Sequence, residues 1–255
     1  MSNLNTFLSN SFSFPLTGSQ VEASKRLDQF FSGDKHCFIL KGYAGTGKTT
    51  TISTFVNSLS SAGKKAVLLA PTGRAAKVIA VYSKRPAFTI HKKIYFPKKQ
   101  TNGSVDFVLQ PNKHRNTIFI VDEAYMIPDG RQNQKMFESS SLLDDLISYV
   151  YSGHLCKLIL IGDTAQLPPV KLAISPALEE NRLEADYHKN VKKIELNEVT
   201  RQHENSGILA NATVLRTLIE NDVTNFQFDL GFPDIVRLVD GYDIEDAITG
   251  CYDND

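Results

Sequence analysis

The residues best suited to chemistry form a glycine-rich segment, Gly42–Thr49, with the sequence GYAGTGKT. This spacing matches the GxxxxGK(S/T) phosphate loop, in which glycines let backbone N–H groups converge on an anion. An apolar run, 36–41, precedes the segment, and a helical pattern of apolar residues, 52–59, follows it. This strand, loop and helix favour a nucleotide phosphate site over an ordinary glycine-rich turn ahead of a helix.

The positions of this loop have expected roles toward ATP and Mg²⁺. Lys48 is expected to contact the β- and γ-phosphates, and the hydroxyl of Thr49 is expected to bind Mg²⁺. The nucleotide-binding residues predicted from the loop are Gly42, Ala44, Gly45, Thr46, Gly47, Lys48, Thr49 and Thr50.

Two acids, Asp122 and Glu123, follow another apolar run, 117–121. The carboxyl end of a strand is where open parallel sheets bind ligands. Asp122 is predicted to hold Mg²⁺ through its water shell, and Glu123 to orient or deprotonate an attacking water. An acid pair alone is weak evidence, because surface loops hold many such pairs. Together with the phosphate loop, however, it predicts a nucleoside triphosphatase.

The alternation of strand and helix patterns indicates an α/β fold with a mostly parallel sheet flanked by helices. Helical patterns run through 17–32, 52–59, 74–81, 142–152 and 208–219, and a short helix is expected at 176–183. Strands are expected at 36–41, 66–70, 117–121, 157–161 and 193–196, with a last short strand at 234–239. Residues 1–15 are expected to be a flexible lead-in, and 127–141 a long surface connection.

An inserted β-hairpin is predicted at about 90–116, where the alternation of strands and helices is interrupted. Asn102-Gly103 gives a strong turn signal between two short strand patterns. Segment 91–115 carries six Lys and Arg residues against one acid, Asp106. These charges fit either contact with DNA or an ordinary solvated surface.

The overall composition is that of an ordinary globular protein, with 42% hydrophobic and 22% charged residues. The formal net charge is zero, so any surface for nucleic acid has to be local. In segment 229–255, eight acids stand against Arg237 alone. The three cysteines form no CxxC pair, which argues against a zinc site or a disulfide framework.

The N-terminal residues lack a basic region followed by an apolar core, and no apolar run reaches about 18 residues. We therefore expect a cytoplasmic protein with no membrane partner.

Six segments resemble the motifs of superfamily 1 DNA helicases, in the RecD and Dda-like 5′-to-3′ branch. They are similar to motifs I, Ia, Ib, II, III and IV, and they lie at Gly42–Thr49, Ala70–Lys77, Thr89–His91, Val121–Ala124, Ile161–Val170 and Val199–Gln202. The third motif, with Gly162-Asp163 followed by Gln166-Leu167-Pro168-Pro169-Val170, is the most specific of them. The resemblance covers most of residues 16–240.

This resemblance implies a RecA-like P-loop ATPase motor at 16–255 that translocates on single-stranded DNA, 5′ to 3′, up to a duplex junction. It implies that Gln20 contacts the adenine, that Gln166 senses the γ-phosphate and that Arg201 supplies positive charge to the transferring phosphoryl group. With Lys48 and Glu123, the last two complete the implied catalytic set. The implied DNA contacts are Pro71, Thr72, Thr89, His91, Lys92, Lys93, Lys98 and Lys99.

Several of these residues also have purely structural alternatives. Gln20 fits the start of a helix, Arg201 fits a surface salt bridge, and His91 fits a capped or buried histidine. Tyr125 stands where these motifs commonly have serine, and Tyr43 stands where small residues are frequent.

The function, too, has alternatives. The chain fits a stand-alone ATP-dependent switch that acts through a protein partner, and an RNA-directed motor also remains open. Nothing after Gln202 resembles the later motifs of the helicase family. We therefore expect a monomeric first motor domain whose second motor domain lies outside this sequence.

Overall fold

The computed structural model describes residues 15–61, 63–99, 101, 103, 105–128, 141–169, 172, 174–198, 206–221 and 223–253. Nearly all of the predicted lead-in, most of the predicted connection at 127–141 and the turn residue Asn102 lie outside the described residues. So do Val170 and Val199–Gln202, including Arg201. The chain separates into two compact units, Met1–Thr200 and Arg201–Asp255, and each is considered by itself.

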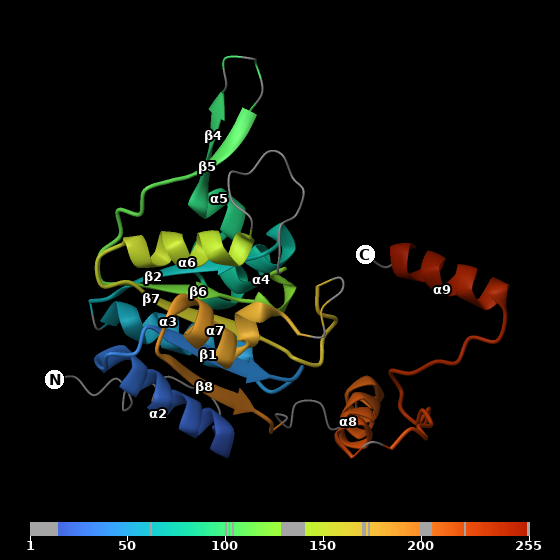
Figure 1. Cartoon of the computed structure of the whole chain (residues 1–255). Coiled ribbons are helices and arrows are strands. Elements are labelled where there is room, and N and C mark those ends of the chain that lie inside the picture. Colours follow the sequence, from blue (N-terminus) through green and yellow to red (C-terminus); the bar gives the residue numbers. More distant parts are fainter. Residues whose placement is uncertain are drawn as a thin grey trace. The chain divides into compact units, whose positions relative to one another are not determined.

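The larger unit is built on a six-stranded sheet in which every pairing is parallel (Figure 1). The strands, in spatial order, are β3 (Ala87–Thr89), β2 (Lys65–Ala70), β6 (Thr117–Val121), β7 (Lys157–Gly162), β1 (Cys37–Gly42) and β8 (Val191–Leu196). This order makes β6, β7 and β1 adjacent. The phosphate loop, the acid pair and Gly162-Asp163 therefore leave the sheet side by side, as the predicted α/β fold requires.

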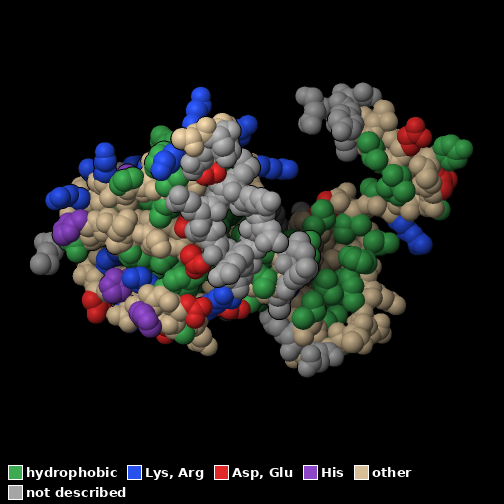
Figure 2. Space-filling view, turned by 45° about the horizontal axis from the view of Figure 1, so that its top comes forward, with side chains coloured by type: hydrophobic (Ala, Val, Ile, Leu, Met, Phe, Trp, Pro, Cys, Tyr) green, Lys and Arg blue, Asp and Glu red, His purple; other side chains and the backbone are tan. Residues whose placement is uncertain are grey.

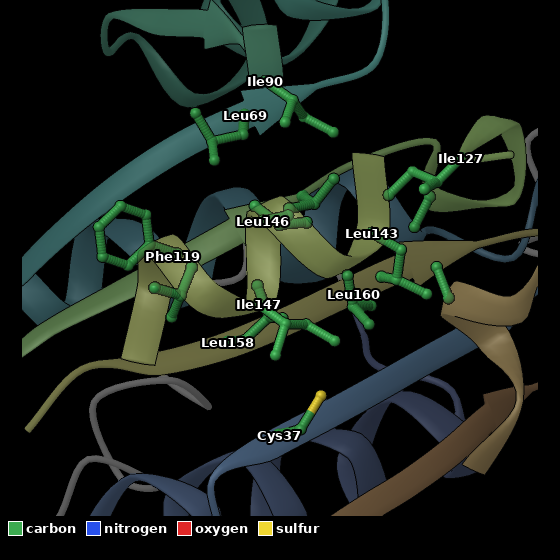
Figure 3. Packing of buried hydrophobic residues seen from close by; sticks show 14 of the residues in the cluster. Cys37, Leu69, Ile90, Phe119, Ile127, Leu143, Leu146, Ile147, Leu158 and Leu160 are labelled. Carbon is green, nitrogen blue, oxygen red and sulfur yellow. The ribbon is translucent and has the colours of Figure 1, made fainter. Parts of the chain in front are cut away.

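Alternate strand residues point to opposite faces of the sheet, and each face has its own apolar layer. In β1, Cys37 and Ile39 face one layer, whereas Phe38 and Leu40 face the other. The first layer is covered by α5 (Ile90–Ile94), α6 (Leu142–Ser152), α7 (Glu180–Tyr187) and the 3₁₀ turns η1 (Ala124–Met126) and η2 (Pro176–Leu178) (Figure 3). The second layer is covered by α2 (Gly18–Ser32), α3 (Lys48–Ser61) and α4 (Gly73–Ser83).

The predicted hairpin is confirmed as the antiparallel pair β4 (Tyr95–Lys99) and β5 (Val105–Leu109) (Figure 1). Gly103 in its turn has a φ of 83°. At the base, the N–H of Gln110 donates to the carbonyl of Ile94 at 2.8 Å. The hydroxyl of Tyr95 donates to the buried carboxylate of Asp145 on α6 at 2.5 Å. These two bonds join the hairpin to the core.

The smaller unit contains α8 (Gly207–Glu220) and α9 (Gly241–Asp253). The carboxylate of Asp234 accepts the N–H of Gly207 at 2.7 Å and the hydroxyl of Ser206 at 2.8 Å, at the start of α8. Figure 2 shows hydrophobic side chains gathered on this unit. Ile208, Val236 and Val239 of this unit are exposed.

The predicted strand at 234–239 is wrong. This stretch has no strand in the structure, and no described strand pairs with it. Val236 is 77% exposed and Val239 is 83% exposed, so neither pairing nor burial supports an extended edge here.

Other differences are smaller. The short helix expected at 176–183 is two elements, η2 and α7, separated at Glu179, and α7 extends to Tyr187. β3 and α9 had not been predicted. Within the described residues, no helix has both the length and the apolar character needed to cross a membrane.

Candidate functional site

The site is formed where the carboxyl ends of β6, β7 and β1 meet. Lys48 belongs to the phosphate loop and is also the first residue of α3, and its Nζ lies 3.8 Å from the carboxylate of Asp163 at the end of β7. Lys48 also lies close enough to Asp122 and Glu123 to act on their charges. Three carboxylates from two strand ends thus gather around one ammonium group.

The phosphate loop has the backbone geometry of an anion cradle. Gly45 and Gly47 have φ values of 78° and 81°, a region that favours glycine. A Cβ on Gly42 would lie 2.7 Å from the hydroxyl oxygen of Thr46 and 3.0 Å from Leu196, so the loop closes too tightly for a side chain there. This cradle fits the phosphates of a nucleotide.

The loop also holds its own lysine. The ammonium of Lys48 donates to the carbonyls of Gly42 at 2.6 Å and Tyr43 at 2.9 Å. The hydroxyl of the buried Thr46 donates to the same carbonyl of Tyr43 at 2.8 Å. The loop is therefore already ordered by internal hydrogen bonds.

The surroundings of the acid pair, Asp122 and Glu123, raise the pKa values of both carboxyl groups. Asp122 is 6% exposed, and burial raises its pKa although the N–H of Glu123 donates to it at 3.0 Å. Burial first, and then the charge of Asp122, raise the pKa of Glu123. Glu123 also has left-handed backbone angles, φ 54° and ψ 37°. The surplus of negative charge suits a divalent cation.

In the described residues, no group of three or more His, Cys, Asp or Glu side chains forms a metal cage. Mg²⁺ normally keeps several waters and binds proteins through one or two carboxylates plus substrate phosphates. Asp122 and Thr49, both at this end of the sheet, therefore fit a magnesium ion shared with a bound nucleotide.

Gln166 lies on the proline-containing loop after β7, beside η1. This loop and η1 line a hollow of about 580 Å³, formed by Tyr125, Met126, Ala165, Gln166, Leu167, Pro168 and Pro169. The N–H of Ala165 donates to Asp163 at 2.9 Å, which holds the loop near Lys48. Burial and then the charges of Glu123, Asp163 and Asp122 raise the pKa of Tyr125. Tyr125 is thus linked both to the acids and to the Gln166 loop.

Gln20 has partners within the protein at both ends of its side-chain amide. Its Nε2 donates to the carbonyl of Thr46 at 3.1 Å, and its Oε1 accepts the N–H of Thr17 at 3.1 Å. The predicted helix-start role is confirmed, because Thr17 and Gln20 form a capping box at the start of α2. Contact with adenine stays a prediction.

A second hollow, of about 530 Å³, lies beside α2 and the edge strand β8. Its lining residues are Ser19, Glu22, Arg26, Lys41, Lys193, Ile194, Glu195, Asn197 and Glu198. The guanidinium of Arg26 donates to the carbonyl of Lys193 at 2.9 Å, so α2 also covers part of the open edge of β8.

The two threonines predicted to bind DNA lie at neighbouring strand ends. Thr72 follows β2 and caps α4 by accepting the N–H of Ala75 at 3.2 Å. Thr89 ends β3 and caps α5 by accepting the N–H of Lys92 at 3.2 Å. β2 and β3 pair through Ala70 and Thr89, which brings Pro71 and Thr72 to the same edge as Thr89. Each capping hydroxyl keeps an O–H that can donate to a phosphate.

His91 and the predicted lysines are carried by α5 and the hairpin. The exposed His91 has its ring 5.7 Å from the ring of Tyr95. The ammonium of Lys93 lies 5.7 Å from the centre of the Phe88 ring. Lys92, Lys98 and Lys99 are exposed, and Lys98 stands opposite Asp106 in the hairpin. In Figure 2, Lys and Arg side chains lie at several places on this side of the larger unit, separated by other side chains.

Two acids of structural importance were not assigned a role from the sequence. Asp163 was read only as part of a motif, although its place at a strand end beside β1 could have paired it with Lys48. Glu198 carried no local signal, yet its carboxylate accepts the N–H groups of Gly18 and Ser19.

Comparison with known proteins agrees with this geometry. Residues 15–226 match the family described as AAA domain. The chain is 30% identical over 181 residues to the ATP-dependent RecD2 DNA helicase of Deinococcus radiodurans, covering 69% of this chain and 22% of that protein. It is 30% identical over 209 residues to the ATP-dependent DNA helicase dda of Enterobacteria phage T4, covering 79% of this chain and 42% of that protein.

Among solved structures, the Pif1 helicase from Candida albicans has a TM-score of 0.51 at 20% identity, over 83% of this chain and 46% of that one. At this identity the likeness concerns the fold. The chain spans about one fifth of the RecD2 relative and about two fifths of the dda relative.

Proposed function

We propose, from the premise that the chain belongs to the AAA domain family as a RecD/Dda-like helicase motor domain, that it hydrolyses ATP to move along single-stranded DNA, 5′ to 3′. The observation that carries this proposal is the meeting of the phosphate loop, the acid pair and Asp163 at three adjacent strand ends. The two curated relatives are named as ATP-dependent DNA helicases, which supports the substrate class.

The chain's own residues divide the work of hydrolysis among them. Lys48 and the backbone N–H groups of the loop hold the phosphates, and Thr49 and Asp122 hold Mg²⁺. When bound, Mg²⁺ neutralises charge on the phosphate oxygens. Glu123 accepts the proton of the attacking water, and its raised pKa makes its carboxylate a stronger base than an ordinary glutamate.

Two residues are proposed to respond to the γ-phosphate. Gln166 senses it from the loop that also lines the hollow with Tyr125. Arg201 supplies positive charge in the transition state, as the family resemblance implies.

The DNA path is proposed to cross the edge formed by Pro71, Thr72 and Thr89 and to continue past His91 to the lysines of α5 and the hairpin. Hydroxyl and ammonium donors at these positions suit the phosphates of the strand, which would give binding with little sequence preference. A further motor domain of the same protein is proposed to complete the grip on DNA.

The first test measures ATP hydrolysis by the intact protein with and without single-stranded DNA. Lys48→Ala and Glu123→Gln are expected to abolish DNA-stimulated hydrolysis, whereas Lys25→Ala and Glu245→Gln, both at exposed positions, serve as matched controls. Hydrolysis that is indifferent to DNA, or that survives both site changes, would refute the motor proposal.

The second test separates the DNA motor from a switch that acts on a protein partner. The affinity for single-stranded DNA is measured over a range of salt concentrations, for the wild type and for the combined alanine variant of Lys92, Lys93, Lys98 and Lys99. A motor loses affinity in the variant and shows a shallower salt dependence, because fewer phosphate contacts release counterions. A protein-binding switch shows no salt-dependent DNA binding in either form. Competition with single-stranded RNA then tests the nucleic-acid preference.

A further inference from the structure

We propose that Ser175 is a positioning residue for the carboxylate of Glu123, a role that rests on the ATP hydrolysis proposed above. Ser175 lies outside all six segments that resemble helicase motifs, 51 positions after Ala124 in the sequence. It reaches Glu123 through η1, the short turn that directly follows Glu123.

The hydroxyl of Ser175 holds η1 at both of its ends. It donates to the carbonyl of Ala124 at 3.1 Å and to the carbonyl of Ile127 at 2.8 Å. The same oxygen accepts the N–H of Ala177 at 3.4 Å, at the start of η2. Ser175 is only 1% exposed, so these contacts are shielded from bulk water. One buried hydroxyl therefore connects the turn after Glu123 to η2.

The turn η1 has few hydrogen bonds of its own. The N–H of Met126 donates to the carbonyl of Glu123 at 3.0 Å, and the N–H of Ile127 donates to the carbonyl of Ala124 at 3.1 Å. No side chain caps the start of the turn. A single 3₁₀ turn is weak because its hydrogen-bond geometry is poor. Contacts from outside the turn are therefore needed to fix its backbone.

Glu123 lies between two anchored neighbours. On one side, the N–H of Asp122 donates to the carbonyl of Leu69 on β2 at 2.9 Å. On the other side, the carbonyl of Ala124 accepts the hydroxyl of Ser175. Glu123 itself has a φ of 54°, a strained conformation that persists only where the surroundings impose it. Without the Ser175 hydroxyl, the backbone of Glu123 could relax toward ordinary angles and displace its carboxylate.

The packing around η1 leaves little room at the end of β7. A Cβ on Gly162 would lie 3.2 Å from the backbone nitrogen of Tyr125 on η1 and 2.6 Å from the Cδ1 of Leu178 on η2. Leu178 is fully buried. Apolar packing of this kind has no preferred direction, whereas hydrogen bonds do. The hydroxyl of Ser175 therefore supplies the directional contact that orients the turn.

The groups proposed to hold the nucleotide are anchored elsewhere. The ammonium of Lys48 donates to the carbonyls of Gly42 and Tyr43 in the phosphate loop, and Asp122 is bonded to β2. Loosening η1 should therefore slow hydrolysis without weakening nucleotide binding. A general loss of structure would affect both.

The first experiment separates these two effects in the intact protein. It measures kcat for DNA-stimulated ATP hydrolysis, and the Kd of a non-hydrolysable ATP analogue with Mg²⁺, for the wild type, Ser175→Ala and Ser175→Cys. Ser175→Ala is expected to lower kcat about ten- to hundredfold, because misplacing a catalytic group by about 1 Å has an effect of this order, and to leave the Kd unchanged. Ser175→Cys keeps a weak donor and should give an intermediate kcat.

The matched control is Ser83→Ala. Ser83 is also 1% exposed, and its hydroxyl donates to the carbonyl of Ile79 within α4. Its removal deletes a buried hydroxyl of the same kind and should change neither kcat nor the Kd.

The second experiment requires no activity. The Tm values of Glu123→Gly and Glu123→Ala are compared with Ser175 present and again in combination with Ser175→Ala. With Ser175 present, the backbone is held in the left-handed region and the glycine variant should have the higher Tm. In combination with Ser175→Ala, the backbone can relax, and the difference in Tm should shrink. Such non-additivity is expected only of coupled positions.

The outcomes distinguish the role of Ser175 from the proposed function. A wild-type kcat in Ser175→Ala, a Kd weakened as much as kcat is lowered, or an unchanged difference in Tm would overturn the positioning role. None of these results would affect the proposed function, because the wild type would still hydrolyse ATP. A wild type that does not hydrolyse ATP would refute that function, and the comparison of Tm values would then decide alone whether Ser175 holds the backbone of Glu123.

Discussion

The left-handed backbone of Glu123 stores strain at the centre of the site. A residue with a Cβ pays about 1–2 kcal/mol in this conformation, and glycine does not. Glycine also has a more flexible unfolded state, which costs about 0.4–1 kcal/mol. The glycine variant should therefore have a free energy of unfolding about 0.5–1 kcal/mol higher than the alanine variant at this φ. For a unit of this size, that gain corresponds to a rise in Tm of about 1–4 °C.

The assay compares Glu123→Gly with Glu123→Ala by thermal unfolding and by urea titration. Both variants remove the carboxylate and differ only in the Cβ, so the charge and side-chain contributions cancel. His188 provides the control, because it has a φ of 51°, is exposed and lies away from the acids at the end of α7. The Tm of His188→Gly should exceed that of His188→Ala by a similar amount.

An alanine variant of Glu123 as stable as, or more stable than, the glycine variant would refute the strain argument, provided that the His188 pair behaves as expected. Both Glu123 variants should be inactive in hydrolysis. The strained backbone is therefore retained for the position of the carboxylate and not for stability.

Three further predictions concern stability. Lys157→Met removes an ammonium that donates to the carbonyls of Phe30 at 2.6 Å and Gly33 at 2.7 Å at the end of α2, and it should cost about 2–3 kcal/mol in urea unfolding. Asp122→Asn should raise Tm at neutral pH. Burial raises the pKa of Asp122 in the folded protein above its ordinary value, so stability falls as the pH rises from the ordinary pKa through the raised one, and the advantage of asparagine should vanish as the pH is lowered below both. An advantage that grows toward acid pH would contradict this sign. Tyr95→Phe removes the hydroxyl that donates to Asp145 and should cost about 1–2 kcal/mol, with faster amide exchange at the hairpin base than in β1.

The elements predicted correctly are those whose signals are local. The apolar runs of β1, β6 and β7 are continuous because both faces of these strands are buried. The hairpin followed from one turn signal between two short strand patterns. β3 was missed because only three residues pair, directly after Pro86, and their apolar signal is too short to stand out.

The false strand at 234–239 shows the opposite error. Its apolar pairs, Ile235-Val236 and Leu238-Val239, suggest a short strand, but strand formation depends on a partner, which the local pattern cannot supply. Asp234 instead bonds to the start of α8 through Ser206 and Gly207.

The candidate site also contains residues that could be predicted from local motifs and contacts that could not. Lys48 could be named from the phosphate-loop motif, and Asp122 and Glu123 from their place directly after a predicted strand. The approach of Asp163 to Lys48 depends on strand order, and the contact of Glu198 with α2 depends on the packing of that helix beside β8. Neither the strand order nor this packing has a signature in neighbouring residues.

The hairpin enters and leaves the core almost at one point, because the carbonyl of Ile94 and the N–H of Gln110 are hydrogen-bonded across its base. An insertion with such closely spaced ends does not alter the path from β3 to β6, whatever its own length. Evolution can therefore lengthen, shorten or replace this module while the ATPase core stays the same.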